Sequence, residues 1–129
     1  MELAFRAALL AWLQADEELN GSLNAIVEEV PSRTALPWLA IAASASTDWS
    51  AKLLTGREIR VALELHYRGD DPLAEAGLLS AIERRVDSMP TDGPGFRIAS
   101  LVFLRSRAEQ RGEARRAALI EYRARVIVD

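Results

Sequence analysis

The chain has 129 residues, half of them hydrophobic, with no cysteine and a formal net charge of −3. That length suits one domain with one core, here residues 1–129, and the balance of apolar and charged residues is that of a globular protein. No apolar run approaches the ~20 residues that span a bilayer, so no membrane segment is expected. Without cysteine, and with His66 as the single histidine, thiolate metal sites are excluded and histidine-based catalysis is disfavoured. We therefore expect no catalytic residue, cofactor or metal, and no enzyme.

The basic residues are almost all arginine, because Lys52 is the only lysine among sixteen. This bias has two interpretations, a GC-rich genome or guanidinium groups that form ion pairs between subunits. The mildly acidic total argues against a dedicated sequence-reading nucleic-acid binder, although DNA could still pass along the surface.

The first predicted element is a helix from Glu2 to about Asp16, ended by Asn20-Gly21. Its start lacks a basic n-region and so predicts a helix rather than a signal peptide. Its apolar residues cover more than one side of the helix. Either Phe5 or Trp12 contacts another subunit, or one of them is partly exposed in a monomer.

Two strands are expected next, a short one over Asn24–Val30, closed by Pro31, and another over Pro37–Ala43. The clearest strand is Arg57–Arg68, in which apolar and polar residues alternate over ten positions. Such alternation indicates an antiparallel sheet with one buried and one wet, charged face.

A second helix is predicted to begin at Asp71 as N-cap with Pro72 in the first turn, and to end at Ser88-Met89-Pro90. Its buried stripe comprises Leu78 or Leu79, Ile82 and Val86. A hairpin follows, formed by strands Phe96–Arg107 and Arg116–Val128. The order α-(β)-β-β-α-β-β favours an α+β fold, an antiparallel sheet with both helices packed on one face.

The segment Ser44–Gly56 joins two strands and is polar, yet it contains Trp49, Leu53 and Leu54 beside Lys52. Either the strands extend and these side chains fold back onto the core, or the segment is a protruding hairpin arm that docks on a partner. In the second case, Trp49→Ser disrupts assembly and leaves the isolated subunit folded.

Charged side chains follow one face of the clearest strand, namely Arg60, Glu64, His66 and Arg68. A row along an open sheet favours cross-strand ion pairs over a convergent acid–base site. Arg111 lies in a second, locally basic segment, which is either a solvated hairpin turn or a cluster that pairs with a neighbouring ring or with DNA phosphates.

The order and spacing of several segments resemble the tail-completion, or tail terminator, family of long-tailed bacteriophages and gene transfer agents. These segments are FRAALLAWLQAD, LPWLAIA, STDWSAKLLTG, REIRVALELHYRGDD, PLAEAGLLSAIERRVDSM and RRAALIEYRARV. The resemblance covers nearly the whole chain except the variable region before LPW.

The resemblance implies a structural virion protein of the tail or neck region, assembled in the host cytoplasm. By family analogy, such subunits form a ring of six that caps the tail tube and joins it to the head–tail connector while DNA passes through the lumen. Implied partners are further copies of the chain, the tail tube protein and a connector or stopper protein, with non-specific DNA contact. Interface candidates are Phe5, Trp12, Trp49, Lys52, Leu53 and Leu54, and candidate lumen or ring-pairing charges are Arg60, Glu64, Arg68 and Arg111.

Two alternatives stay open at this point. The chain could be a head-closure or neck connector protein, which shares the class but not the position. It could also be a small α+β binding domain with no role in a virion.

Overall fold

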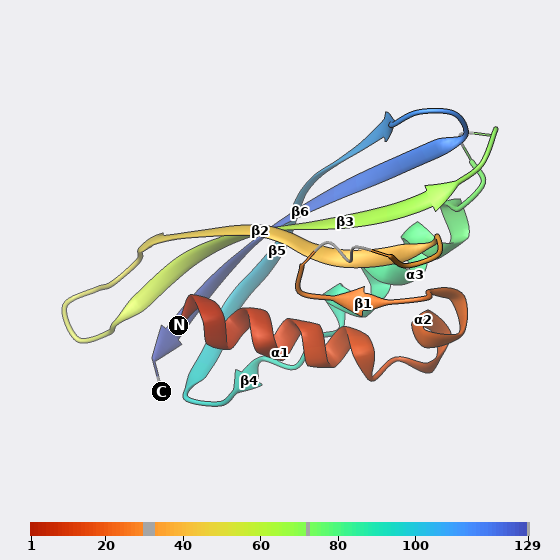
Figure 1. Cartoon of the computed structure of the whole chain (residues 1–129). Coiled ribbons are helices and arrows are strands. Elements are labelled where there is room, and N and C mark those ends of the chain that lie inside the picture. The colour runs from red at the N-terminus through yellow and green to blue at the C-terminus, as the bar shows by residue number, and fades with distance from the viewer. Residues whose placement is uncertain (30–32, 72, 129) are drawn as a thin grey trace.

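A curled six-stranded sheet forms the body of the molecule, and three helices lie against one of its faces (Figure 1). The computed structural model describes residues 1–29, 33–71 and 73–128. Its elements are α1 (Glu2–Gln14), α2 (Glu17–Ser22), β1 (Ile26–Val27), β2 (Trp38–Asp48), β3 (Gly56–Arg68), α3 (Ala76–Asp87), β4 (Asp92–Gly93), β5 (Phe96–Gln110) and β6 (Arg115–Val128). The predicted mixed α+β class is confirmed.

The strand order is β1-β2-β3-β6-β5-β4. All neighbouring strands pair antiparallel except β1, which runs parallel to β2. The prediction of a purely antiparallel sheet is therefore wrong at this edge. Of the described residues of the first expected strand, Ile26–Val27 form β1 and pair with β2. The predicted end of that strand at Val30 and Pro31 lies outside the described residues.

The helices differ from the prediction in number and in one boundary. The predicted stop at Asn20-Gly21 lies inside the additional helix α2, which Asp16 caps by accepting a hydrogen bond from Leu19 N at 3.0 Å. Helix α3 begins only at Ala76, and Asp71 instead accepts a hydrogen bond from Leu73 N in the preceding turn. The expected N-cap at Asp71 is therefore wrong, and Pro72 lies outside the described residues.

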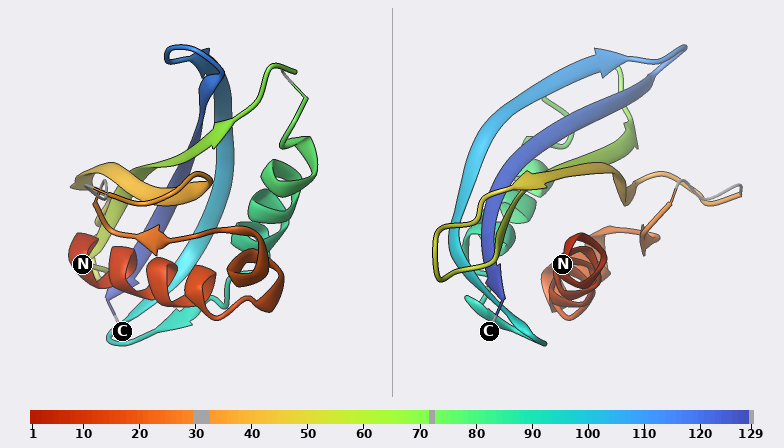
Figure 2. Two further views of the ribbon diagram at one scale, coloured as in Figure 1. Left: turned by 45° about the vertical axis from the view of Figure 1, so that its right-hand side comes forward. Right: turned by 90° about the vertical axis from the view of Figure 1, so that its left-hand side faces the viewer.

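One hydrophobic core joins the helices to the sheet. The inward side chains of β3 and β6 alternate as expected, and helix α3 contributes the expected stripe. The helical members of this core are Phe5, Leu9, Leu13, Leu19, Leu78, Ala81, Ile82 and Val86. Since all of them join one core with the sheet, the helices cover a single face, as Figure 2 shows. The opposite face of β3, β5 and β6, turned away from the helices, is called the open face below.

Among the described residues, no helix combines the length and the apolar character needed to cross a membrane.

Candidate interaction surfaces

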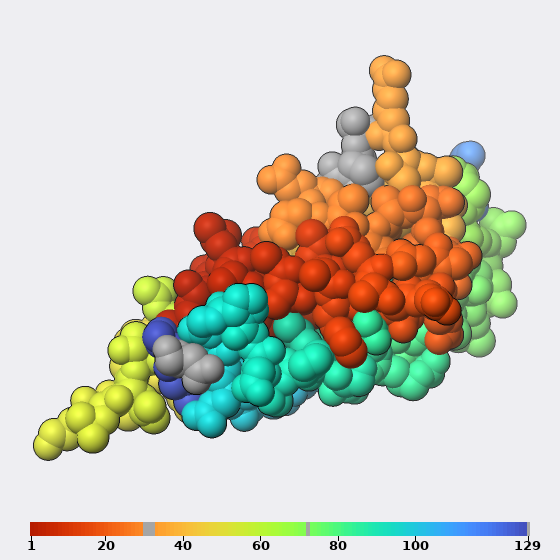
Figure 3. Space-filling model, turned by 90° about the horizontal axis from the view of Figure 1, so that it is seen from below, coloured from red at the N-terminus to blue at the C-terminus, as the bar shows by residue number. Residues whose placement is uncertain are grey.

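The hairpin between β2 and β3 carries an apolar tip, residues 49–55, outside the core. Leu53 is 92% exposed, Leu54 50% and Trp49 37%, and Lys52 beside them is exposed as well. Figure 3 shows this segment in yellow, projecting from the body of the subunit. No described part of the chain covers the side chains of Leu53 and Leu54 to the extent that core residues are covered. The tip is therefore a surface on which another molecule could bury apolar area.

Local hydrogen bonds fix the shape of the hairpin tip. Trp49 N donates to Gly56 O at 2.9 Å, and Gly56 N donates to the hydroxyl of Ser50 at 3.0 Å. A Cβ on Gly56 would lie 2.6 Å from Trp49 O, so the two strands can approach here only because residue 56 is glycine. The Trp49 ring also lies 5.4 Å from the guanidinium of Arg125 on β6. The ring is thus anchored on one side, while Leu53 points to solvent.

Helix α1 places its two candidate interface residues in different environments. Phe5 is fully buried and meets Phe96 edge-on at 6.5 Å between ring centroids. The prediction that Phe5 contacts another subunit is wrong, because the helix turns this side chain into the subunit's own core. Trp12 is half-buried and bonds to Arg85 of α3. Trp12 also lines a shallow, mainly apolar groove of about 340 Å³ between α1 and residues 89–96.

The open face carries the candidate charges. Glu64 lies 3.0 Å from His66 Nε2 and 3.8 Å from the guanidinium of Arg111. Strand β3 and the turn between β5 and β6 therefore contribute to one cluster of charged side chains. Arg60 and Arg68 are exposed, and no carboxylate of the described residues forms an ion pair with either of them.

At one end of the open face, the side chains are less exposed to solvent than the alternation of β3 predicts. Trp38 stacks on His66 with 4.0 Å between ring centroids and is only 6% exposed. The side chains of Glu64 and His66 are in turn only 17% and 16% exposed. The expectation of a uniformly solvated polar face is wrong here, because a tryptophan from the neighbouring strand covers it.

Several ion pairs on the open face could not be predicted from the sequence, and two of them lower the pKa of a glutamate. Glu121 of β6 accepts hydrogen bonds from Arg105 of β5, and these bonds hold the pKa of the Glu121 carboxyl below its ordinary value. A hydrogen bond from Arg111 likewise lowers the pKa of Glu109. Predicting the pair of Arg105 with Glu121 requires the register between β5 and β6. That register shifts at two bulges, whose positions cannot be derived from the sequence alone.

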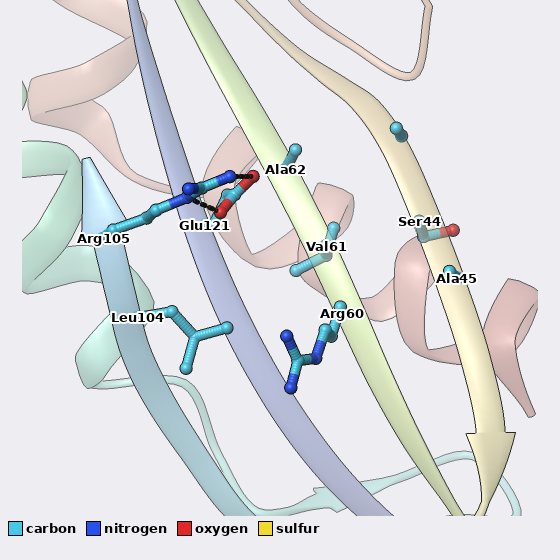
Figure 4. Close-up of a pocket in the computed structure, with 9 residues that line it drawn as sticks. Ser44, Ala45, Arg60, Val61, Ala62, Leu104, Arg105 and Glu121 are labelled. Carbon is cyan, nitrogen blue, oxygen red and sulfur yellow. Dashed lines mark hydrogen bonds and ion pairs between the residues drawn. The ribbon is translucent and has the colours of Figure 1, made fainter. Parts of the chain in front are cut away.

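Figure 4 shows Arg60, Arg105 and Glu121 around a shallow depression of about 280 Å³ on the open face. Its floor consists of small side chains such as Ala45 and Ala62. The hydroxyl of Ser44, one of the lining residues, donates to the carboxylate of Glu2 and accepts from Arg6 at 2.8 Å, so both contacts tie it to α1. Glu121 is the single carboxylate among the lining residues, so no pair of carboxylates converges on the depression. Among the described residues, no group of three or more His, Cys, Asp or Glu side chains could hold a metal ion. The arrangement suits contact with another molecule rather than chemistry.

Comparison with known proteins agrees with this arrangement. Residues 7–127 match the family described as "Tail completion protein gp17", and the chain belongs to this family. It is therefore a structural protein of the virion tail and neck region, not an enzyme, as the resemblance in the sequence predicts. No curated protein matches. A solved chain from the "Virion of native gene transfer agent (GTA) particle" has the same fold, with a TM-score of 0.84 at 20% identity; the match covers 96% of this chain and 95% of that one.

Proposed function

We propose that the chain is a tail terminator subunit that assembles into a ring, most simply a hexamer, on the end of the tail tube. In this position the ring stops growth of the tube and joins it to the connector or stopper protein of the head. DNA passes through its lumen. Membership of the tail completion family and a fold shared with a chain of a gene transfer agent virion both support this role.

The observation that carries the proposal is the apolar hairpin tip. Leu53, at 92% exposure, and Leu54, at 50%, cost solvation free energy in an isolated subunit. Trp49 and Lys52 extend the same surface, and aromatic residues are favoured anchors at interfaces. We propose that the tip docks on a neighbouring subunit or on the adjacent ring of the tail.

Further contacts belong to the same proposal. The groove beside Trp12 offers a second apolar surface, at a different place from the tip. A contact between two different surfaces of like subunits is heterologous, and such contacts close into rings when the rotation permits. Arg60, Glu64, Arg68 and Arg111 on the open face are then the charges that line the lumen or pair between rings.

The test compares Leu53→Ser with the matched control Leu73→Ser, which replaces a leucine that is 72% exposed outside the hairpin. Light scattering and negative-stain microscopy follow ring formation, alone and on purified tail tubes. Circular dichroism follows folding. We expect Leu53→Ser to lose rings while its unfolding transition stays unchanged, and Leu73→Ser to keep them. Equal ring formation by both variants and the wild type would contradict the role of the tip.

A further inference from the structure

Positive charge is concentrated on the open face although the chain as a whole is acidic. The two central strands, β3 and β6, contribute five arginines to this face, two and three respectively, by the alternation that buries Ile59 and Ile120. Only three glutamates accompany them. These five arginines are Arg60, Arg68, Arg115, Arg123 and Arg125.

Strand β5 and the following turn add to this excess. Strand β5 contributes Arg97, Arg105 and Arg107 with Glu109, and Asp92 of β4 faces Arg97. The turn after β5 contributes Arg111 and Glu113. Altogether this gives nine arginines and six carboxylates. Their net charge of +3 contrasts with −3 for the chain, so the rest of the sequence carries −6. The charges of the subunit are therefore segregated by face.

Two pairs of arginines lie directly opposite each other across β3 and β6. Arg60 pairs in register with Arg123, and Arg68 with Arg115. Like charges at directly opposed positions destabilise a sheet. Arg60, Arg68 and Arg115 form no ion pair with a described residue. Arg123 pairs with Glu58 at 4.0 Å, although its buried Nε has no hydrogen-bond partner among the described residues. The Arg68–Arg115 pair is therefore unfavourable in the isolated subunit, and an external anion would relieve it.

We propose that the open face binds the phosphate backbone of duplex DNA, with the exposed Arg60, Arg68 and Arg115 as its main contacts. This inference rests on the proposed ring, which would surround the DNA. Guanidinium groups suit phosphate because their donors match two phosphate oxygens at once. Arg60 and Arg68 are eight residues apart on β3, a span of ~27 Å that several phosphates could follow.

The rest of the face favours a duplex over a single strand and loose contact over tight contact. Single-strand binding uses exposed aromatic rings on which bases stack, but Trp38, an aromatic side chain of this face, is buried against His66. Interspersed carboxylates such as Glu58 and Glu121 already engage some arginines and weaken binding to a polyanion. A surface of this kind holds DNA in a salt-dependent way without fixing its position.

The test measures binding of a fluorescent 30-base-pair duplex by anisotropy between about 20 and 200 mM salt. Over such a range the affinity of a protein that makes several phosphate contacts falls ~10³-fold. The double variant Arg68→Ser/Arg115→Ser should weaken binding at least several-fold and reduce the slope of log K against log salt by about 2, one for each lost phosphate contact. The single variant Arg68→Ser should reduce the slope by about 1. Its control is Arg84→Ser, which removes one exposed charge from the helix side of the subunit and should leave the slope unchanged. Thermal unfolding should show the double variant at least as stable as the wild type, because a like-charge pair is removed.

Three results would overturn the proposal. The wild type could fail to bind the duplex at 20 mM salt, the double variant could bind like the wild type, or Arg84→Ser could weaken binding as much as Arg68→Ser. Binding of poly-glutamate but not of the duplex would instead indicate an acidic protein partner for this face. Mass measurement of the same samples records ring formation separately. Wild-type rings that form normally but do not bind the duplex contradict this inference and leave the terminator role standing.

Discussion

The guanidinium of Arg85 lies 3.3 Å from the ring centroid of Trp12 and ties α3 to α1. The indole Nε1 of Trp12 donates to Arg85 O at 2.7 Å, and Arg85 Nε donates to Trp12 O at 2.9 Å. Arg85 also approaches Asp16 at 3.6 Å. One residue pair therefore combines a cation–π contact with two reciprocal hydrogen bonds, and it holds α3 against α1.

Arg85→Lys should destabilise the subunit by about 1–2 kcal/mol, because lysine cannot stack on the indole and donate to the Trp12 carbonyl in the same geometry. Urea unfolding followed by tryptophan fluorescence measures the loss. Arg84→Lys, on the exposed neighbour, is the control and should leave the midpoint unchanged. A midpoint for Arg85→Lys equal to that of the wild type would show that the pair contributes nothing.

Tyr122→Phe should leave stability unchanged or raise it by about 1 kcal/mol. The Tyr122 ring is fully buried and meets Phe103 edge-on, but its hydroxyl has no hydrogen-bond partner among the residues that the structure describes. Burial, assisted by the charges of Asp87 and Glu83, raises the pKa of this phenol above its ordinary value. Removing an unsatisfied buried hydroxyl removes a desolvation cost. Thermal unfolding tests this, and a large loss of stability would reveal a partner for the hydroxyl.

Gly56→Ala should destabilise the hairpin by about 1–3 kcal/mol, since the added Cβ would lie 2.6 Å from Trp49 O and 3.1 Å from Val126 O. Gly77→Ala is the matched control, because nothing lies within 4 Å of a Cβ added in helix α3. That variant should gain about 0.5–1 kcal/mol from helix propensity. Chemical denaturation compares the two, and opposite signs are expected. The same sign for both would contradict the close approach at Gly56.

Stability should fall as the pH drops below about 4.5. The folded-state pKa of Glu121 is lowered, first by its hydrogen bond with Arg105, and that of Glu2 is lowered, first by its hydrogen bond with Ser44. A depressed folded pKa gives stability that is present above the unfolded pKa and is lost as the pH falls through the folded pKa. Glu121→Gln should therefore flatten the acid limb of a plot of unfolding midpoint against pH. An unchanged limb would show that the ion pair with Arg105 does not act on stability.

Much of the sheet could be predicted from the sequence, because β3 alternates without interruption and one face must be buried. The orientation of α1 could not be predicted. Its apolar residues lie all around the helix, so only the packed structure shows that Phe5 is buried and Leu3 is 76% exposed. Helix α2 carried a usable signal in Asp16, an N-cap before two glutamates, but its six residues include asparagine and glycine, which disfavour a helix.

Of the two candidate surfaces, one could be predicted from the sequence and the other could not. The composition of the hairpin tip indicated an interaction surface, since Leu53 and Leu54 have no place in a solvated loop. The alternation of β3 predicted a charged face, but the excess of positive charge on the open face could not be recognised in the sequence. It depends on register across β3, β6 and β5, which places Arg60 opposite Arg123 although 63 positions separate them.

The mass of the assembly formed by the purified wild-type chain, alone and in the presence of tail tubes, tests the central claim most directly. Native mass spectrometry, with microscopy of the tube ends, should find a closed ring at six times the 14.2 kDa chain mass, seated on one end of each tube and preventing its growth. A chain that stays monomeric at every concentration, and leaves tubes uncapped and growing, would contradict the terminator role.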